Sequence, residues 1–268
     1  MSRRMMLAWA AALCLLPGVR ADDATKQPTA DDIAKAEKAV KDQLAKYKAA
    51  YGQVTQLKDD ALGKAFTGYT FFGVLYRQYP VGRLVPKPLK PSNVFAVGRD
   101  GKPQLINEPK ALEKFFREHA RGGSADHAKD GVRAWLMLAS QLKQDGFFRF
   151  KLMDDDTRAE KDKGGLVASG KIVVMQGGSG YLAAKVTFDS DGKFAKVTEE
   201  AKIRPGPRPI CQATKLLDKD PIVRRMAEQD LLIMGRAAKP YLDEQRAKAS
   251  PELRRAIDRL WQRILDEN

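Results

Sequence analysis

Residues 164–203 read GGLVASGKIVVMQGGSGYLAAKVTFDSDGKFAKVTEEAKI, and apolar and polar side chains alternate through much of this stretch. Alternation with a period of two is typical of β-strands with one buried face. GGSG at 177–180 and DSDGK at 189–193 interrupt the pattern with residues that favour short hairpin connections. Together with FFRFKL at 147–152, the pattern predicts four strands in an antiparallel meander, with a charged loop after the first strand.

Helical patterns come before this meander. Apolar residues recur every three or four positions over 33–51, and Thr29 and Asp32 have the spacing of a capping box. Two further helices are predicted at 107–120 and 128–144. Helices followed by a meander predict an α+β fold in which helices cover one face of the sheet and water the other. This order of elements is similar to that of curved rolls of the cystatin-like or nuclear-transport-factor-like type.

The segment between the first helix and the others has strand character. AFTGYTFFGVLYRQY at 65–79 is aromatic and β-branched, and it predicts a strand. A proline-rich loop follows at 81–93, extended because residues before proline avoid the helical region. NVFAV and PQLI then flank GRDGK at 98–102, which predicts a hairpin.

The carboxyl-terminal pattern is helical again. In DPIVRRMAEQDLLIMGRAAKPYL (220–242), Asp220 can cap a helix, Pro221 suits its first turn and Gly235 suits its end. Two more helices are predicted, through Pro240 and after Ser250. The phrase Pro-x-Val-Arg-Arg at 221–225 returns as Pro-x-Leu-Arg-Arg at 251–255.

These features resemble HEAT repeats, in which paired helices stack into a solenoid. The resemblance covers about residues 208–268 and extends over one and a half units, the second shorter than usual. It implies stacked helices that recognise another protein on a helical face. The residues that carry it are Asp220, Pro221, Val223, Arg224, Ala227, Leu231, Gly235, Ala238, Pro240 and Leu242.

RPGPRP at 204–209 joins the meander to these helices. Its prolines stiffen a short segment, because polyproline-like chain is a semi-rigid spacer. Since about three repeat units are needed for independent stability, we expect the preceding domain to cover the apolar residues of the helices. The segment is therefore predicted to be a brace. The apolar residues in question are Ile222, Val223, Met226, Leu231, Ile233, Leu260, Trp261 and Ile264.

The amino terminus has the pattern of an export signal. MSRRMMLAWAAALCLLPGVRA (1–21) begins with arginines, continues with an apolar run and ends at a small residue. The run is shorter than the roughly 20 residues of a membrane span, although an uncleaved anchor is the alternative. We predict a signal peptide at 1–21, an α+β domain at 22–203, a joint at 204–209 and a helical tail at 210–268. The mature protein is expected in the periplasm or outside the cell, with no integral membrane span after leader removal.

The chain is basic and poor in cysteine. Its 48 Lys and Arg residues against 34 Asp and Glu give a net charge of +14. Such a surplus favours anionic partners, but a solvated basic surface gives the same count. Cys211 is the one cysteine outside the leader, so no intramolecular disulfide is expected. Its apolar surroundings favour a buried, inert thiol, with pairing between chains or a nucleophilic role as alternatives.

The sequence contains no motif for catalysis or for binding a metal or cofactor. HExxH, CxxC and dinucleotide-binding patterns are absent. His119 and His127 lack the further ligands that zinc needs, and Asp154–Asp156 and Asp189–Gly192 lack the spread ligands of a calcium loop. We predict no catalytic residue, metal or cofactor. An enzyme with a carboxylate or tyrosine site in the concave pocket of the roll stays open.

The best candidate for ligand binding is the basic segment 65–110. It carries seven Lys and Arg residues against two acids, and Tyr76 and Tyr79 interleave with the first of them, as a surface that stacks sugars or bases requires. A proline-rich loop kept soluble by its lysines is the simpler alternative. The predicted ligand residues are Arg77, Tyr79, Arg83, Lys87 and Lys90.

These patterns predict an exported bacterial envelope protein that binds or assembles with another envelope protein and is not catalytic. Two alternatives are kept. One is a secreted enzyme, and the other is a protein that binds an anionic polymer through the basic loop 77–110.

Overall fold

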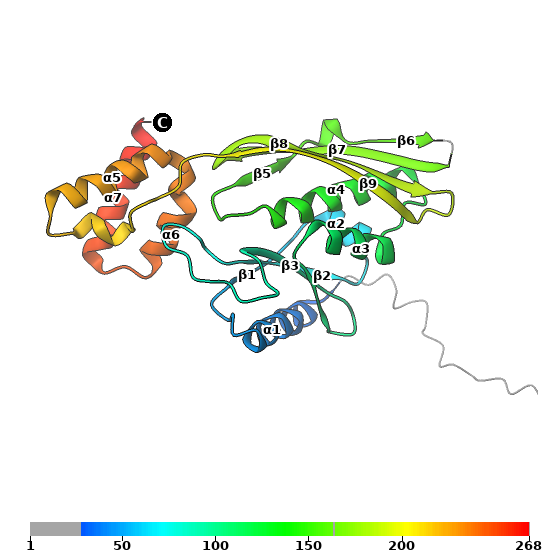
Figure 1. Cartoon of the computed structure of the whole chain (residues 1–268), viewed down its shortest axis with the longest axis horizontal. Coiled ribbons are helices and arrows are strands. Elements are labelled where there is room, and N and C mark those ends of the chain that lie inside the picture. The colour runs from blue at the N-terminus through cyan, green and yellow to red at the C-terminus, as the bar shows by residue number, and fades with distance from the viewer. Residues whose placement is uncertain (1–27, 163, 268) are drawn as a thin grey trace, which may run out of the picture.

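The computed structural model describes residues 28–162 and 164–267, so the predicted signal peptide at 1–21 lies outside the described residues. Helices and two antiparallel sheets are stacked in layers, which confirms the α+β class (Figure 1). A group of helices, the tail, lies at one end of the molecule. Within the described ranges, no helix is both long enough and apolar enough to cross a membrane.

The predicted meander forms the larger sheet, which we call the long sheet. Its main strands are β7 (Gly165–Gln176), β8 (Gly178–Asp189) and β9 (Phe194–Pro205), and they pair antiparallel in chain order. β5 (Arg149–Leu152) pairs with the second half of β7. The four predicted strands are therefore confirmed. One face of the sheet packs on helices, and most side chains of β9 are exposed.

A fifth strand occupies the segment that the sequence predicts as a charged loop. β6 (Arg158–Asp162) pairs with residues 165–169 of β7. β5 reaches only residues 172–176 of β7, so β6 pairs with a part of the β7 edge that β5 does not reach. A charged edge strand is well tolerated, because pairing uses the backbone and leaves the side chains in water. The prediction of a loop at 158–162 was wrong.

Four antiparallel strands in chain order form a second sheet, the short sheet. β2 and the β3–β4 hairpin agree with the sequence, and the hairpin turn places Gly101 at a φ of 69°, which favours glycine. β1 and the short helix α2 (Asp60–Ala65) were not predicted, because so few residues show no clear period. The strands are β1 (Gln53–Gln56), β2 (Thr70–Leu75), β3 (Ser92–Val97) and β4 (Pro103–Ile106).

Helix α4 (Ala125–Leu142) lies between the two sheets, and α3 (Pro109–His119) lies near it (Figure 1). Buried residues of α4 pack in one cluster with residues of β7, β8 and β3. α1 (Ala30–Lys46) covers the other face of the short sheet, and Thr29 and Asp32 form the predicted capping box. The short sheet is thus a separate layer that is covered on both faces. The long sheet is covered on one face, and its other face is in contact with water. The cystatin-like or nuclear-transport-factor-like roll stays a prediction.

The tail (residues 210–268) begins after the joint. Asp220 accepts a hydrogen bond from the backbone N–H of Ile222, Pro221 opens the first helix, and Gly235 ends it at a φ of 57°. These caps agree with the sequence. The elements are a 3-10 turn at Ala213–Leu217, α5 (Pro221–Met234), a 3-10 turn at Gly235–Ala238, α6 (Lys239–Ala247) and α7 (Pro251–Glu267).

The tail has a hydrophobic core of its own. Buried residues of α5, α6 and α7, among them Leu231, Leu260 and Ile264, form one cluster. Among the described residues of the body (28–203), only Phe147 belongs to that cluster. The expectation that the body covers these residues was wrong, because the tail covers them itself.

Three other apolar residues of this set are mostly exposed. Ile222, Met226 and Ile233 are 59%, 56% and 68% exposed. The expectation of cover from the body was wrong for these as well. Val223 and Trp261 are half-buried.

Candidate functional site

Two of the five predicted ligand residues lie at the junction between body and tail. Arg77, which follows β2, forms an ion pair with Glu244 of α6 at 2.5 Å, and its guanidinium carbon lies 5.3 Å from the ring centre of Tyr241. Tyr79 lies beside Phe147, with the ring centres 6.4 Å apart. Arg77 therefore links the two parts of the molecule, and Tyr79 packs next to that link.

The other three predicted residues are exposed and separate. The guanidinium carbon of Arg83 lies 5.5 Å from the ring centre of Tyr51. The amines of Lys87 and Lys90 make no ion pair or hydrogen bond with any residue in the described ranges. The structure thus brings Arg77 and Tyr79 to one place and shows no contact that adds the other three to it.

Tyr76 points away from any ligand surface. It is 2% exposed, and its hydroxyl donates a hydrogen bond to the carbonyl of Ala49 at 3.0 Å. Burial raises its pKa to about 12. Neighbouring residues of an extended chain point to opposite sides, so Tyr76 is turned into the core and Arg77 to the junction. The expected stacking surface of Tyr76 and Tyr79 was therefore wrong.

The joint is bound to the body through Arg208. Its side chain is 8% exposed, and its Nε donates to the carboxylate of Asp145 at 2.6 Å. Its guanidinium carbon lies 5.1 Å and 4.9 Å from the ring centres of Phe147 and Phe148. These contacts support the interpretation of the joint as a brace.

Both histidines of the chain line one hollow of about 460 Å³. The Tyr69 hydroxyl is 3.2 Å from each ring nitrogen of His119, so it is aligned with neither lone pair, whereas acid–base catalysis needs a directed bond. Burial raises the pKa of Tyr69 and lowers that of His119. The described part of the chain has no group of three His, Cys, Asp or Glu that could hold a metal. The hollow shows no catalytic arrangement.

The lowered pKa of His119 predicts a pH dependence of stability. The unfolded chain protonates this histidine near pH 6.5, and the folded protein only at lower pH, so stability falls as pH decreases through that window. We expect His119→Gln to reduce the slope of the free energy of unfolding between pH 7.5 and about 5.5, as measured by urea titration. His127→Gln, at an exposed position, is the matched control. An unchanged slope in the His119 variant would contradict the prediction.

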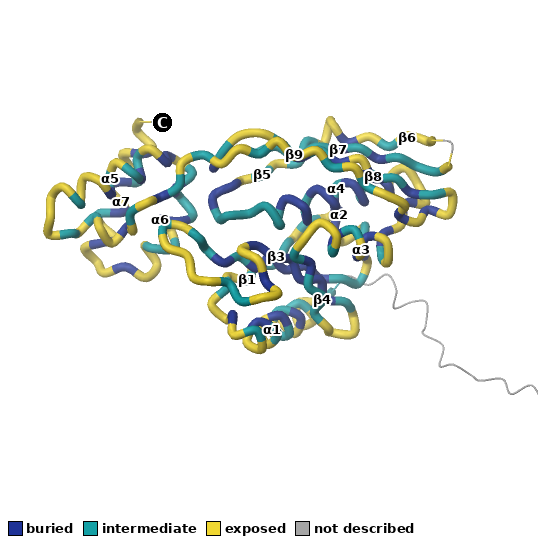
Figure 2. The backbone as a smooth tube through the Cα atoms, viewed as in Figure 1, coloured by how far each residue is buried: buried dark blue, intermediate teal, exposed yellow. Residues whose placement is uncertain are grey.

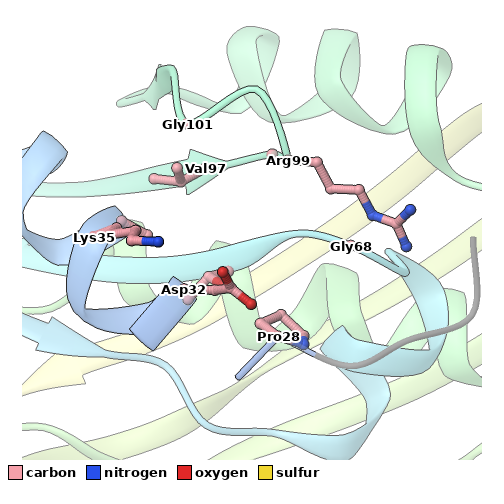
Figure 3. A pocket seen from close by; sticks show the side chains of 10 residues that line it. Pro28, Asp32, Lys35, Gly68, Val97, Arg99 and Gly101 are labelled. Carbon is pink, nitrogen blue, oxygen red and sulfur yellow. The ribbon is translucent and has the colours of Figure 1, made fainter. Parts of the chain in front are cut away.

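A second hollow, of about 490 Å³, lies between the start of α1 and the β3–β4 turn (Figure 3). Asp32 and Lys35 come from α1, and Arg99 extends from the turn along Gly68. Asp32 accepts hydrogen bonds from the backbone N–H and hydroxyl of Thr29, so its carboxylate serves the helix cap. These contacts are structural, and we assign no function to this hollow.

The outer face of α5, defined by Ile222, Met226 and Ile233, is the most distinctive surface. These residues are four and seven positions apart, so they share one side of the helix, opposite Ala227 and Leu231 in the core. More than half of each side chain is exposed. Figure 2 shows α5 at the end of the molecule away from both sheets. The outer face is therefore open to a partner.

Further exposed apolar and basic residues lie on other sides of the tail. Ile210 is 83% exposed, and its backbone N–H donates to Asp230 of α5 at 2.7 Å, which holds it beside the helix. Leu217 is 43% exposed and lines a hollow of about 610 Å³ between α5 and α7. Arg225 and Arg259 line the same hollow, and neither forms an ion pair with any residue that the structure describes. Unpaired positive charge therefore lies around α5 from the apolar outer face, in the hollow between α5 and α7.

One sequence signal could have identified the outer face. α5 is apolar on two sides, whereas a surface helix that packs on one core is apolar on one. The second apolar side is then either buried in an interface or exposed to solvent. No known protein family, curated protein or solved structure matches the chain, so the function is argued from this surface itself.

Proposed function

We propose that this is an exported, non-catalytic binding module of the bacterial envelope, whose tail docks on another protein through the outer face of α5. The exposed apolar row of Ile222, Met226 and Ile233 is the observation that carries the proposal. Exposed apolar side chains gathered on one side of a helix, here with the exposed Gln229 between Met226 and Ile233, mark interaction sites in soluble proteins. Export is supported by the leader-like pattern of residues 1–21.

The surroundings of the face indicate the chemistry of the partner. Arg225 and Arg259 present guanidinium groups that no described carboxylate neutralises. A complementary protein segment therefore offers apolar side chains for the outer face and carboxylates for these arginines, because matched charges suppress wrong partners. An amphipathic acidic helix fits both requirements.

The test is to place a charge on the outer face. Met226→Glu should weaken binding to the envelope partner by at least about tenfold, because a central apolar contact of an interface is worth about 2 kcal/mol or more. The free energy of unfolding should change by less than about 0.5 kcal/mol, since the side chain is exposed. Partners are recovered by cross-linking in envelope extracts and identified, and their affinity for each purified variant is then measured.

Met175→Glu is the matched control, because Met175 is 57% exposed and lies on β7, outside the tail. It should bind the partner like the unchanged protein. Equal binding by the Met226 and Met175 variants would contradict the proposal. If the recovered partner were a second copy of this chain, sedimentation would show a dimer that Met226→Glu dissociates, and the proposal of a different protein partner would fail.

A further inference from the structure

A cavity of about 570 Å³, the junction cavity, lies where the body meets the tail. Its body wall includes Gln53 and Thr55 of β1, which pair with Leu75 and Gly73 of β2. α4 ends at residue 142, and the final turn contributes Gln141. α6 of the tail forms the opposite wall. The cavity therefore needs the tail to lie against the body.

Two arginines line the junction cavity. Arg77 uses one terminal nitrogen for the ion pair with Glu244, while its other terminal nitrogen, Nη1, is buried and has no hydrogen-bond partner in the described protein. Arg149 of β5 donates from Nη1 to the carbonyl of Phe148. Partial burial of its guanidinium lowers its pKa, although the residue as a whole is exposed. Because Nη1 of Arg77 has almost no accessible surface, the guanidinium of Arg149 is the one that a ligand in the cavity can reach.

Neutral polar groups complete the lining. The side chains of Gln53, Thr55 and Gln141 make no hydrogen bond with any described residue. They are free to donate to and accept from a ligand. Gly73 has no side chain between them, and a Cβ there would lie 3.3 Å from Oε1 of Gln141. Such a set of amides and hydroxyls suits a ligand rich in hydroxyl or amide groups.

The charges of the lining limit the ligand further. The lining contains two bases, Arg77 and Arg149, and two acids of α6, Asp243 and Glu244. Glu244 already pairs with Arg77, and Asp243 with Lys239. Arg149 forms no ion pair with any described residue, so one negative charge on a ligand is matched by Arg149 and a second is not. The volume falls within the usual range of small-molecule sites.

We propose that the junction cavity binds a small organic monocarboxylate whose remaining polar groups are hydroxyls or amides. The carboxylate accepts from the guanidinium of Arg149, and the hydroxyls or amides bond to Gln53, Thr55 and Gln141. An acidic sugar and the carboxyl end of a short peptide share this chemistry. The site is separate from the outer face of α5, so it does not depend on the proposed docking function.

Calorimetric titration of the purified protein tests the site. The probes are glucuronate and N-acetyl-alanyl-alanine, each paired with a neutral analogue, glucose and N-acetyl-alanyl-alanine amide. We expect saturable binding of at least one acid, with its neutral analogue weaker by about tenfold or more, since bonds to charged groups are the stronger ones. The two acids distinguish a sugar site from a peptide site.

Two variants and a control locate the binding. Arg149→Gln should lower the affinity by about tenfold, and Thr55→Val, which removes a hydroxyl at nearly constant volume, should lower it several-fold. Arg158→Gln on the exposed edge strand β6 is the matched control and should bind like the unchanged protein. Thermal melts verify that each variant is folded. The proposal fails if neither acid binds at millimolar concentration, if the neutral analogues bind equally, or if Arg149→Gln binds as the control does.

Discussion

Replacing Phe147 by alanine should lower the free energy of unfolding by about 3–5 kcal/mol, the usual cost of truncating a buried phenylalanine. The side chain is 1% exposed and is the body residue inside the tail core. Its ring lies 6.5 Å from that of Tyr241 and beside the guanidinium of Arg208. The other residues of the cluster belong to the tail, so the space left by the ring opens mainly in the tail core. The change should therefore loosen the tail more than the body.

Tryptophan fluorescence and circular dichroism can separate the two parts. Outside the predicted signal peptide at 1–21, the tryptophans are Trp135 in the central core and Trp261 in the tail. In a Trp261→Phe background, fluorescence reports on the body alone. With Phe147→Ala added, we expect the circular dichroism transition of the helices to begin at a lower urea concentration than the fluorescence transition. Leu84→Ala, at a 94% exposed position, is the control and should cost less than about 0.5 kcal/mol. A loss below about 1 kcal/mol for Phe147→Ala would contradict the assigned role.

Local signals in the sequence predicted the elements well, because caps and turns are decided by neighbouring residues. The Thr29–Asp32 capping box, the Asp220 cap and the turn at Gly101 all form as expected. Strands β1 and β6 were missed for the opposite reason. Each is short, and its extended conformation depends on pairing with the next long strand, β2 or β7. The residues of β1 and β6 do not alternate between apolar and polar, so their own pattern does not show this pairing.

The candidate sites were less predictable, because the burial of a side chain and the direction in which it points depend on tertiary structure. The pattern of α5 shows that Ile222 and Met226 are apolar, but not that the tail core closes without them. Arg77 was identified by its charge, whereas its place in the junction depends on Glu244, more than a hundred residues away. The junction cavity also needs Arg149, which the sequence offers only as one charged residue in an aromatic strand.

Replacing Arg208 by alanine should cost about 3 kcal/mol of stability. Breaking a buried ion pair by removing one partner costs about 3–5 kcal/mol, because the other charge is left without compensation. We expect the lower end of this range. Asp145 is 21% exposed and keeps a hydrogen bond from the backbone N–H of Phe147 at 2.9 Å. Arg208 also donates to the carbonyl of Gly206 at 3.0 Å, so its loss should free the joint as well.

Two comparisons separate the charge of Arg208 from its packing on Phe147 and Phe148. Arg208→Met keeps an apolar side chain over the rings, so the difference between the methionine and alanine variants measures packing. A double-mutant cycle with Asp145→Asn gives the coupling between the two charges, which we expect to be about 1–3 kcal/mol. Both are read from urea unfolding at constant pH.

The matched control is the pair of Arg246 and Asp258 in the same tail. Its geometry is at least as good, since Nε and Nη2 of Arg246 contact the two carboxylate oxygens at 2.6 Å and 3.1 Å. Both side chains are 51% exposed, however, and exposed pairs are weakened by water and salt. Arg246→Ala should therefore lower the free energy of unfolding far less than Arg208→Ala does. Equal losses of stability in the two variants would mean that burial does not strengthen the ion pair of Arg208. The connection between body and tail at the joint would then have to come from Phe147 alone.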